Sequence, residues 1–213
     1  MISVIIPTKN EPYVKYLVKE IKKTLKRDFE IIIVEASNKL PKIKNVKVIK
    51  QKGTGLGKAF LQGLKHAKGD IIVLMDGDGS HSPKFLPSLI KNLNDSDIVV
   101  GSRFIKDGKT LDETHRRIIS FIFRKFAAFI LGLDLKDNMS GFAAFKRSVF
   151  DKIKPDAIGY KIVLETAYKA KKKGLKIKEV PITFYPRRMG KSKSTVLEGL
   201  KTIFLIFKLR FFS

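Results

Sequence analysis

The sequence predicts an α/β protein with a mostly parallel central β-sheet, and three observations lead to this prediction. Short apolar runs alternate with amphipathic segments through the first half of the chain, which is the pattern of βαβ units. A length of 213 residues allows one domain with a substantial core. The composition is 44% hydrophobic and has no cysteine, so we expect a globular protein without disulfides or thiolate metal sites.

The first half of the chain is expected to form buried strands with helices between them. The first helix shows the reason, since its apolar residues recur three and four positions apart. The expected strands are Ile2–Pro7, Glu30–Glu35, Asn45–Lys50, Asp70–Asp76 and Asp97–Gly101. The expected helices are Glu11–Arg27, Gly55–Gly69 and Ser82–Leu93.

The second half has a different pattern. A phenylalanine-rich helix is expected at Arg116–Leu135, followed by a short strand and helix within 140–153. An amphipathic helix is expected at Lys161–Gly174, where the glycine is a typical helix stop. A strand is expected at Leu175–Phe184, and the tail 194–213 is expected to form a helix that becomes strongly apolar.

The charge balance is strongly basic. Lysine and arginine number 44 against 20 acidic residues, for a net charge of +24. This excess favours a polyanionic partner, which means nucleic acid, anionic lipid or a phosphate-bearing substrate, although a general lysine bias would also produce it. No nucleic-acid-binding motif is recognised, so we expect no nucleic acid partner. Because Met1 leads straight into a strand and no apolar run reaches about 18 residues, neither a signal peptide nor a spanning helix is expected.

The segment 71–81, IIVLMDGDGSH, carries the clearest chemical signal. Asp76 and Asp78 directly follow a buried strand, and ligands of open α/β sheets bind at the carboxyl ends of the strands. Two carboxylates at this spacing suit a hard divalent cation, Mg²⁺ or Mn²⁺, that is shared with substrate phosphates. The glycines beside them allow close approach of a ligand, and Ser80 offers a further oxygen.

Glycine-containing segments allow three other interpretations: a calcium loop, a plain Asp-Gly turn and a phosphate-binding loop. A calcium loop starting at Asp76 is excluded because His81 and Pro87 stand where glycine and glutamate are required. A plain Asp-Gly turn stays open, although the next segment predicts a helix. The segment 53–58, GTGLGK, does not fit a phosphate-binding loop; its glycines suit either an anion at a helix N-terminus or a tight packing turn. Lys58 is kept as a candidate for donor binding.

Several segments in order resemble the family 2 glycosyltransferases of the GT-A fold, and most of all the dolichyl-phosphate mannose synthases and related polyprenyl-phosphate glycosyltransferases. The resemblance covers nearly the whole chain. The segments are SVIIPTKNE, GLGKAFLQGLKHAKGDIIVLMDGDGSHSP, IVVGSRF, RRIIS, DNMSGFAAFKRSVF, GYKIVLE and RRMGKSK.

The resemblance implies that a nucleotide sugar binds in the first half of the chain and that its diphosphate meets Mn²⁺ or Mg²⁺. Asp76 and Asp78 match the acidic motif of the family, with Asp78 expected to contact the metal directly. Ser80 would be a third ligand, where similar enzymes carry glutamine.

The family also implies positions for the rest of the donor. Relatives usually carry an Asp-Asp pair after the second strand, whereas this chain has Glu35 followed by Ala36, so the base of the donor is left open. The expected donor-binding residues are Pro7, Asn10, Glu11, Glu35, Lys58, Asp76, Asp78, Arg187 and Lys193, the last of these with Ser192 in a basic loop that closes over the diphosphate.

The acceptor phosphate is expected to meet Arg103, Arg116 and Ser120, which match the phosphate-holding positions of the family. Arg116 and Ser120 are four residues apart, so on a helix they share a face. Because a phosphate is already ionised at neutral pH, little help from a general base is needed, and a single in-line attack predicts inversion at the anomeric carbon. The expected catalytic residues are Asp76, Asp78, Arg103 and Arg187.

The sequence therefore predicts metal-dependent transfer of a hexose, mannose from GDP-mannose above others, to polyprenyl (dolichyl) phosphate. The alternatives are UDP-glucose or another UDP-sugar as the donor, or a basic binding protein without turnover. We expect a catalytic domain at 1–195, with a nucleotide-sugar half at 1–105 and an acceptor half at 106–195. The segment 196–213 is expected to be an amphipathic, membrane-associating helix.

A membrane surface is a further expected partner. Two segments with basic residues contain half of the 16 phenylalanines, and an apolar aromatic face with cationic flanks suits a helix lying in the membrane interface. Packing in the core, or against a second copy in a homo-oligomer, is the alternative. The expected location is peripheral, on the cytoplasmic face of a membrane. The phenylalanines are Phe121, Phe123, Phe126, Phe129, Phe204, Phe207, Phe211 and Phe212.

Overall fold

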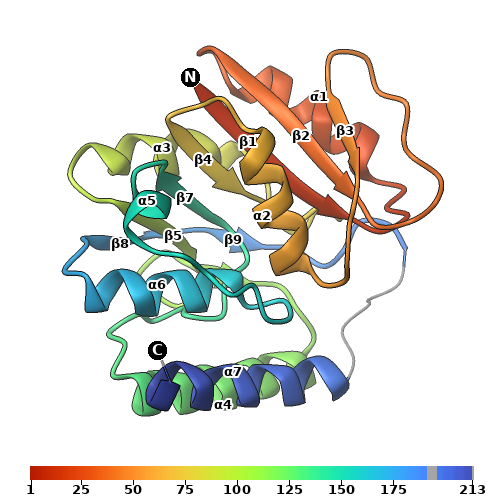
Figure 1. The fold of residues 1–213 in the computed structure, drawn as a ribbon. Helices are drawn as coiled ribbons and strands as arrows, with labels where there is room; N and C mark the ends of the chain where they lie inside the picture. Colours follow the sequence, from red (N-terminus) through yellow and green to blue (C-terminus); the bar gives the residue numbers. More distant parts are fainter. Residues whose placement is uncertain (191–195, 213) are drawn as a thin grey trace.

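The structure of the protein, a computed structural model, describes residues 1–190 and 196–212. Its centre is a seven-stranded sheet with the strand order β3-β2-β1-β4-β7-β5-β8 (Figure 1). Neighbouring strands are parallel except where β7 runs antiparallel to both β4 and β5. The predicted α/β fold with a mostly parallel sheet is confirmed.

The strands fall close to the predicted positions. A separate ribbon of two short strands, β6 and β9, was not predicted. The strands of the large sheet are β1 (Ile2–Thr8), β2 (Phe29–Glu35), β3 (Lys47–Lys50), β4 (Ile71–Leu74), β5 (Ile98–Ser102), β7 (Ala143–Lys146) and β8 (Ile177–Pro181). The ribbon consists of β6 (Lys109–Thr110) and β9 (Thr183–Phe184).

The helices are shorter than predicted at several ends. The expected helix 82–93 consists of α3 between two 3-10 turns, η1 and η2, and Pro87 lacks the N–H that would bond to the carbonyl of Pro83 in one continuous helix. The helices are α1 (Val14–Thr24), α2 (Leu56–His66), α3 (Leu86–Lys91), α4 (Thr114–Leu131), α5 (Val149–Lys152), α6 (Ile162–Lys172) and α7 (Val196–Phe212). The turns are η1 (Pro83–Phe85) and η2 (Asn92–Asn94).

The prediction of one strand over Leu175–Phe184 was wrong. β8 pairs with β5 and ends at Pro181, and the N–H of Ile182 donates to the carbonyl of Ser102 at 3.0 Å. The chain then leaves the large sheet, and β9 pairs with β6. Alternation of residue types along the sequence does not distinguish one long strand from two strands in different sheets.

Helices cover both faces of the sheet (Figure 1). α1 and α3 pack on one face, and α2 and α6 contribute to the core on the other face. The apolar spacing that predicted α1 is confirmed, since Val14, Leu17, Val18 and Ile21 are all buried. Burial of each such side chain contributes about 1.5–3 kcal/mol, so this layered core holds the strand ends in fixed positions.

α4 and α7 lie side by side below α6 and form a third layer (Figure 1). They share a smaller core that includes Ala127, Leu131, Leu205, Ile206 and Leu209. Their outer faces expose large apolar residues: Ile118, Ile119, Phe121, Ile122, Phe129, Leu197, Leu200, Ile203, Phe204, Phe207, Phe211 and Phe212. Within the described ranges, no helix combines the length and hydropathy needed to cross a bilayer.

Candidate functional site

The acidic motif lies at the carboxyl end of β4, next to the end of β1. The N–H of Met75 donates to the carbonyl of Ile5 at 3.2 Å, and the chain then turns away from the sheet. Gly77 is needed beside β1, because a Cβ there would fall 2.7 Å from Cγ2 of Thr8. Asp76 and Asp78 therefore project from a turn that the buried sheet holds in place.

The turn after Asp78 is closed by its own side chain. Oδ1 of Asp78 accepts hydrogen bonds from the N–H of Ser80 at 3.0 Å and from its hydroxyl at 2.5 Å. Gly79 has φ +80°, and a Cβ there would lie 2.6 Å from Cε1 of Tyr13. Ser80 thus orients the Asp78 carboxylate, and its role as a metal ligand stays a prediction.

Arg187 connects the acidic motif to the first loop. One guanidinium nitrogen lies 2.5 Å from Oε2 of Glu11, and the other lies 3.0 Å from Oδ2 of Asp78. The N–H of Arg188 also donates to the carbonyl of Asp78 at 3.0 Å. Three predicted residues that are distant in sequence, Glu11, Asp78 and Arg187, are therefore brought together. Lys193 and Ser192 lie outside the described residues.

The Asp76 side chain is 30% exposed and lies beside His81. Burial and the negative charge of Asp78 raise the pKa of Asp76 to about 7, against the opposing charges of Lys161, Arg187 and Arg103. A Cβ on Gly141 would lie 3.3 Å from Oδ2 of Asp76, so the glycine keeps the space beside this carboxylate open.

His81 is hydrogen-bonded to the backbone of Asp76 and was not among the predicted site residues. Its Nδ1 accepts the N–H of Asp76 at 3.4 Å, and its ring stacks on Phe142 with centroids 5.0 Å apart. Burial lowers the pKa of His81 to about 4, so the ring is neutral and acts as an acceptor at neutral pH. The proximity of Nδ1 to Oδ2 of Asp76, 3.5 Å, is therefore not a charged pair.

Arg103 is fixed by a carboxylate that the sequence did not reveal. Asp137 is fully buried and accepts from Nε of Arg103 at 2.7 Å and from Nη2 at 2.8 Å. It also accepts the backbone N–H of Arg103 at 2.9 Å. The only signal was its place in DNMSGF, a segment whose resemblance was noted without assigning the aspartate a role.

The predicted acceptor residues are only partly assembled. Nη2 of Arg103 lies 3.5 Å from the hydroxyl of Ser120, on α4. Arg116, one turn earlier on α4, is 45% exposed and lies 3.6 Å from Glu113. Arg103 and Ser120 are therefore neighbours, and Arg116 stands at the exposed start of α4.

The first loop is held by Glu35. One of its oxygens accepts the N–H groups of Asn10 at 2.8 Å and Ser37 at 2.6 Å, and the other accepts the Thr8 hydroxyl at 2.8 Å. Burial opposes ionisation of Glu35, but these hydrogen bonds outweigh it and lower its pKa below the ordinary glutamate value. Glu35 is 1% exposed, so its observed role is to fasten the loop that carries Asn10.

The two remaining donor-binding candidates are Pro7 and Lys58, and their contact with the donor stays a prediction. Pro7 belongs to β1 and is paired with Val34 of β2. Lys58 is exposed in the first turn of α2, with its stem beside Gly53. Gly57 fits the tight-turn interpretation, because a Cβ there would lie 3.0 Å from Cα of Ala157.

Lys161 interacts electrostatically with Asp76, Arg103 and Asp137 and was not predicted as a site residue. It precedes α6, and its ammonium donates to the carbonyl of Met139 at 3.3 Å. Burial lowers the pKa of Lys161, and the positive charge of Arg103 adds to this effect. Its segment, GYKIVLE, was quoted for the resemblance, but a single lysine among many carries no signal of its own.

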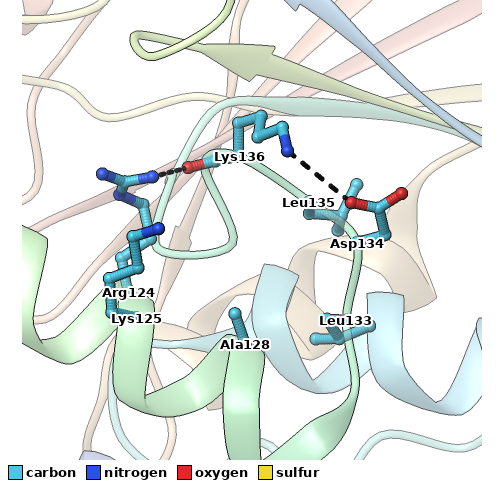
Figure 2. Close-up of a pocket in the computed structure, with 7 residues that line it drawn as sticks. All are labelled: Arg124, Lys125, Ala128, Leu133, Asp134, Leu135 and Lys136. Carbon is cyan, nitrogen blue, oxygen red and sulfur yellow. Dashed lines mark hydrogen bonds and ion pairs between the residues drawn. The ribbon is translucent and has the colours of Figure 1, made fainter.

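A cavity of about 110 Å³ lies beside the second half of α4 (Figure 2). Arg124 spans one side and donates to the carbonyl of Lys136 at 2.6 Å, while the Lys136 ammonium lies 3.8 Å from Asp134. The cavity is lined by Arg124, Lys125, Ala128, Leu133, Asp134, Leu135 and Lys136. It adjoins Asp137 in sequence but contains none of the predicted site residues.

The acidic motif has the chemistry of a hard-cation site that needs a ligand to complete it. Within the described part of the chain, no cluster of three or more histidine or acidic residues is placed to hold a metal ion. Asp76 and Asp78 supply carboxylate oxygens, the ligand type that Mg²⁺ and Mn²⁺ take, and such ions usually obtain further ligands from substrate phosphates and water. The donor set fits these ions on that basis.

Comparison with known proteins gives the fold and the site a context. Residues 3–154 match the family model described as glycosyl transferase family 2. The chain is 36% identical over 235 residues to a dolichol-phosphate mannosyltransferase of Pyrococcus furiosus, covering 97% of this chain and 64% of that protein. It is 37% identical over 146 residues to an undecaprenyl-phosphate mannosyltransferase of Micrococcus luteus, covering 65% and 60%.

Among solved structures, glucosyl-3-phosphoglycerate synthase of Mycobacterium tuberculosis, in complex with Mn²⁺, UDP and glucosyl-3-phosphoglycerate, is similar with a TM-score of 0.73. The sequences are 20% identical, and the match covers 99% of this chain and 80% of that one, so it shows a shared fold. The chain spans about three fifths of the length of the curated relatives named above.

Proposed function

Because this chain belongs to glycosyl transferase family 2, we propose that it transfers mannose from GDP-mannose to a polyprenyl phosphate such as dolichyl phosphate. The names of the two curated relatives support the sugar and the class of acceptor. The observation that carries the proposal is the set of charged residues around the acidic motif. Arg187 lies 3.0 Å from Oδ2 of Asp78, and the positive charges of Lys161, Arg187 and Arg103 act on Asp76.

The donor diphosphate would bind on the side of Asp78 and Arg187. Asp76 and Asp78 would hold Mn²⁺ or Mg²⁺, which neutralises charge on the leaving diphosphate when bound. Arg187 can donate paired hydrogen bonds to phosphate oxygens, and Glu11 and Asp78 already hold its guanidinium at this place. Glu35 keeps the neighbouring loop in shape through its bond to Asn10.

The acceptor phosphate would bind on the side of Arg103 and Ser120. Asp137 fixes the plane of the Arg103 guanidinium, so little side-chain freedom is lost when a phosphate binds. Arg116 stands at the exposed start of α4 and would meet the phosphate as it enters.

The transfer requires no catalytic base. An ionised oxygen of the acceptor phosphate forms a bond to the anomeric carbon as the bond from that carbon to the nucleoside diphosphate breaks. The chain's contribution is to align the two phosphates and stabilise the departing charge. One displacement predicts inversion, so an α-linked donor should give a β-linked product, and an α-linked product by NMR contradicts this mechanism.

The α4–α7 layer would place the site at the cytoplasmic face of a membrane. Its exposed apolar side chains accompany basic residues such as Arg117, Lys125 and Arg210, and each cation near an anionic surface contributes about 1 kcal/mol. Phe129→Glu and Phe204→Glu should each reduce flotation with anionic vesicles. If they instead break a homo-oligomer and leave flotation unchanged, the face is a protein interface.

The activity is tested by transfer of labelled sugar into organic-extractable lipid. Dolichyl phosphate and Mn²⁺ would be combined with GDP-mannose, UDP-glucose or UDP-N-acetylglucosamine. We expect label from GDP-mannose only, abolished by a chelator and by Asp78→Asn. The matched control, Asp151→Asn, changes an exposed aspartate of α5 and should retain activity. Transfer from a UDP-sugar would correct the donor, and no transfer by folded protein would favour a binding protein without turnover.

A further inference from the structure

Three cations act on Asp76: Lys161, Arg187 and Arg103. Two of them already have carboxylate partners. Arg187 lies against Glu11 and Asp78, and Arg103 lies against the buried Asp137. For Lys161, no carboxylate among the described residues lies within ion-pair distance. Its neighbouring negative charges, Asp76, Asp137 and Glu198, act on it from farther away.

The ammonium of Lys161 is held in place without being satisfied. One hydrogen bond, to the carbonyl of Met139 at 3.3 Å, is its contact with protein in the described ranges. An ammonium has three N–H donors, so two are left for a ligand. Desolvating a charged group costs free energy that a counter-charge must offset, and no carboxylate among the described residues is paired with this ammonium.

The backbone around Lys161 keeps this position rigid. The carbonyl of Gly159 accepts the N–H of Gly57 at 3.1 Å, which ties the segment to α2. The carbonyl of Lys161 itself accepts the N–H of Glu165 at 3.1 Å, the first bond of α6. Glu165, fully buried, accepts the N–H of Ala157 at 3.0 Å. These hydrogen bonds fix the backbone turn that carries Lys161, and a binding group needs such a rigid support.

We propose that Lys161 binds the phosphate of the polyprenyl acceptor, together with Arg103 and Ser120. This inference rests on the proposed function and adds a residue to its acceptor side. Lys161 interacts electrostatically with Asp76, Asp137 and Arg103. It therefore lies between Asp76, which is assigned to the donor, and Arg103, which is assigned to the acceptor phosphate. A phosphate there receives charge from Lys161 and Arg103 and has its attacking oxygen directed toward the donor at Asp76.

Binding of farnesyl phosphate, a short polyprenyl phosphate, tests the proposal by calorimetry without donor. Lys161→Met should weaken this binding about ten- to a hundredfold, the range for one lost charge-assisted hydrogen bond. Lys161→Arg should recover part of it, because the charge remains. Lys173→Met removes an exposed lysine just after α6 and should bind as wild type does. Binding of GDP with Mn²⁺ should be unchanged in all three variants.

Parallel titrations identify the ligand and the source of any failure. Inorganic phosphate should bind weakly, and equal binding of both probes would overturn the lipid assignment. If the Lys161→Met variant no longer binds GDP but still binds farnesyl phosphate, the lysine contacts the donor instead of the acceptor. Lys161→Gln repeats the test if the methionine variant unfolds on heating. If wild type transfers sugar and Lys161→Met binds and transfers equally well, only this inference fails; if wild type neither transfers nor binds, the proposed function fails with it.

Discussion

The two arginines of the candidate site, Arg103 and Arg187, are held in different ways. Arg103 donates through its side chain and its backbone to a single aspartate with no exposed surface, Asp137. Arg187 divides its guanidinium between Glu11 and Asp78, and its side chain is 22% exposed. The comparison teaches that Arg103 is part of the core as well as of the site, whereas Arg187 belongs to the site alone.

The largest expected effect comes from removing the buried partner of Arg103. Asp137→Ala leaves a guanidinium that is 11% exposed without its counter-charge, so the free energy of unfolding should fall by about 3–5 kcal/mol. Denaturant unfolding measures this. Asp134→Ala, which removes a 98% exposed aspartate, is the matched control and should change little. A loss below about 1 kcal/mol for Asp137→Ala would show that Arg103 is not anchored as described.

A smaller effect is expected at Glu35, a buried carboxylate that is held by hydrogen bonds rather than by an arginine. Glu35→Gln should lower the free energy of unfolding at pH 7 by about 1–3 kcal/mol. Because the folded-state pKa of Glu35 is lowered, the wild-type advantage should be present above the ordinary glutamate pKa and shrink as the pH falls through the folded value. Urea unfolding of both proteins from pH 7 to pH 3 checks this, and a difference that stays constant would contradict it.

Arg187 should matter far more for transfer than for stability. Arg187→Gln should reduce the free energy of unfolding by about 1–2 kcal/mol, less than Asp137→Ala, because the Arg187 side chain is 22% exposed and glutamine can still donate a hydrogen bond to Glu11 or Asp78. Transfer should fall by about a hundredfold or more, because the donated charge acts where negative charge develops. Unfolding and initial rates, measured on the same preparation, test the contrast. A stability loss as large as that of Asp137→Ala would remove the distinction between the two arginines.

The smallest effect on stability is expected at Arg116. Its side chain is 45% exposed and its pairing with Glu113 lies on the surface, so Arg116→Gln should change the free energy of unfolding by less than about 0.5 kcal/mol. Arg116→Gln should weaken the binding of lipid phosphate at low salt. The difference in affinity from wild type should become smaller as the salt concentration is raised, because salt screens exposed charges. Salt-independent weakening would instead indicate a buried contact with the phosphate.

Much of the fold could be predicted because it depends on local patterns. The buried strands β1, β2 and β4 and the apolar face of α1 follow directly from the spacing of apolar residues. The β6–β9 ribbon and the break after Pro181 could not be predicted from the sequence, because they depend on which distant segments pair. Similarly, nothing local indicates that β7 inserts antiparallel between β4 and β5.

The site shows the same division. Asp76 and Asp78 stand out because two carboxylates follow an apolar strand, and Arg103 and Arg187 stood out through the resemblance. His81, Asp137 and Lys161 were missed as site residues because their roles depend on burial and on neighbours far away in the sequence. Sequence reasoning found groups that belong to recognised motifs and missed the buried groups that lie beside them.

The central claim is that Arg187 serves the donor and the Arg103–Ser120 side serves the acceptor. The most direct measurement is two-substrate kinetics on Arg187→Gln and Ser120→Ala, with nucleotide sugar and lipid phosphate varied in turn. The account predicts that Arg187→Gln raises KM for the nucleotide sugar and that Ser120→Ala raises KM for the lipid phosphate, each leaving the other KM near the wild-type value. If both variants raise the same KM, the division of the site into a donor side and an acceptor side is contradicted.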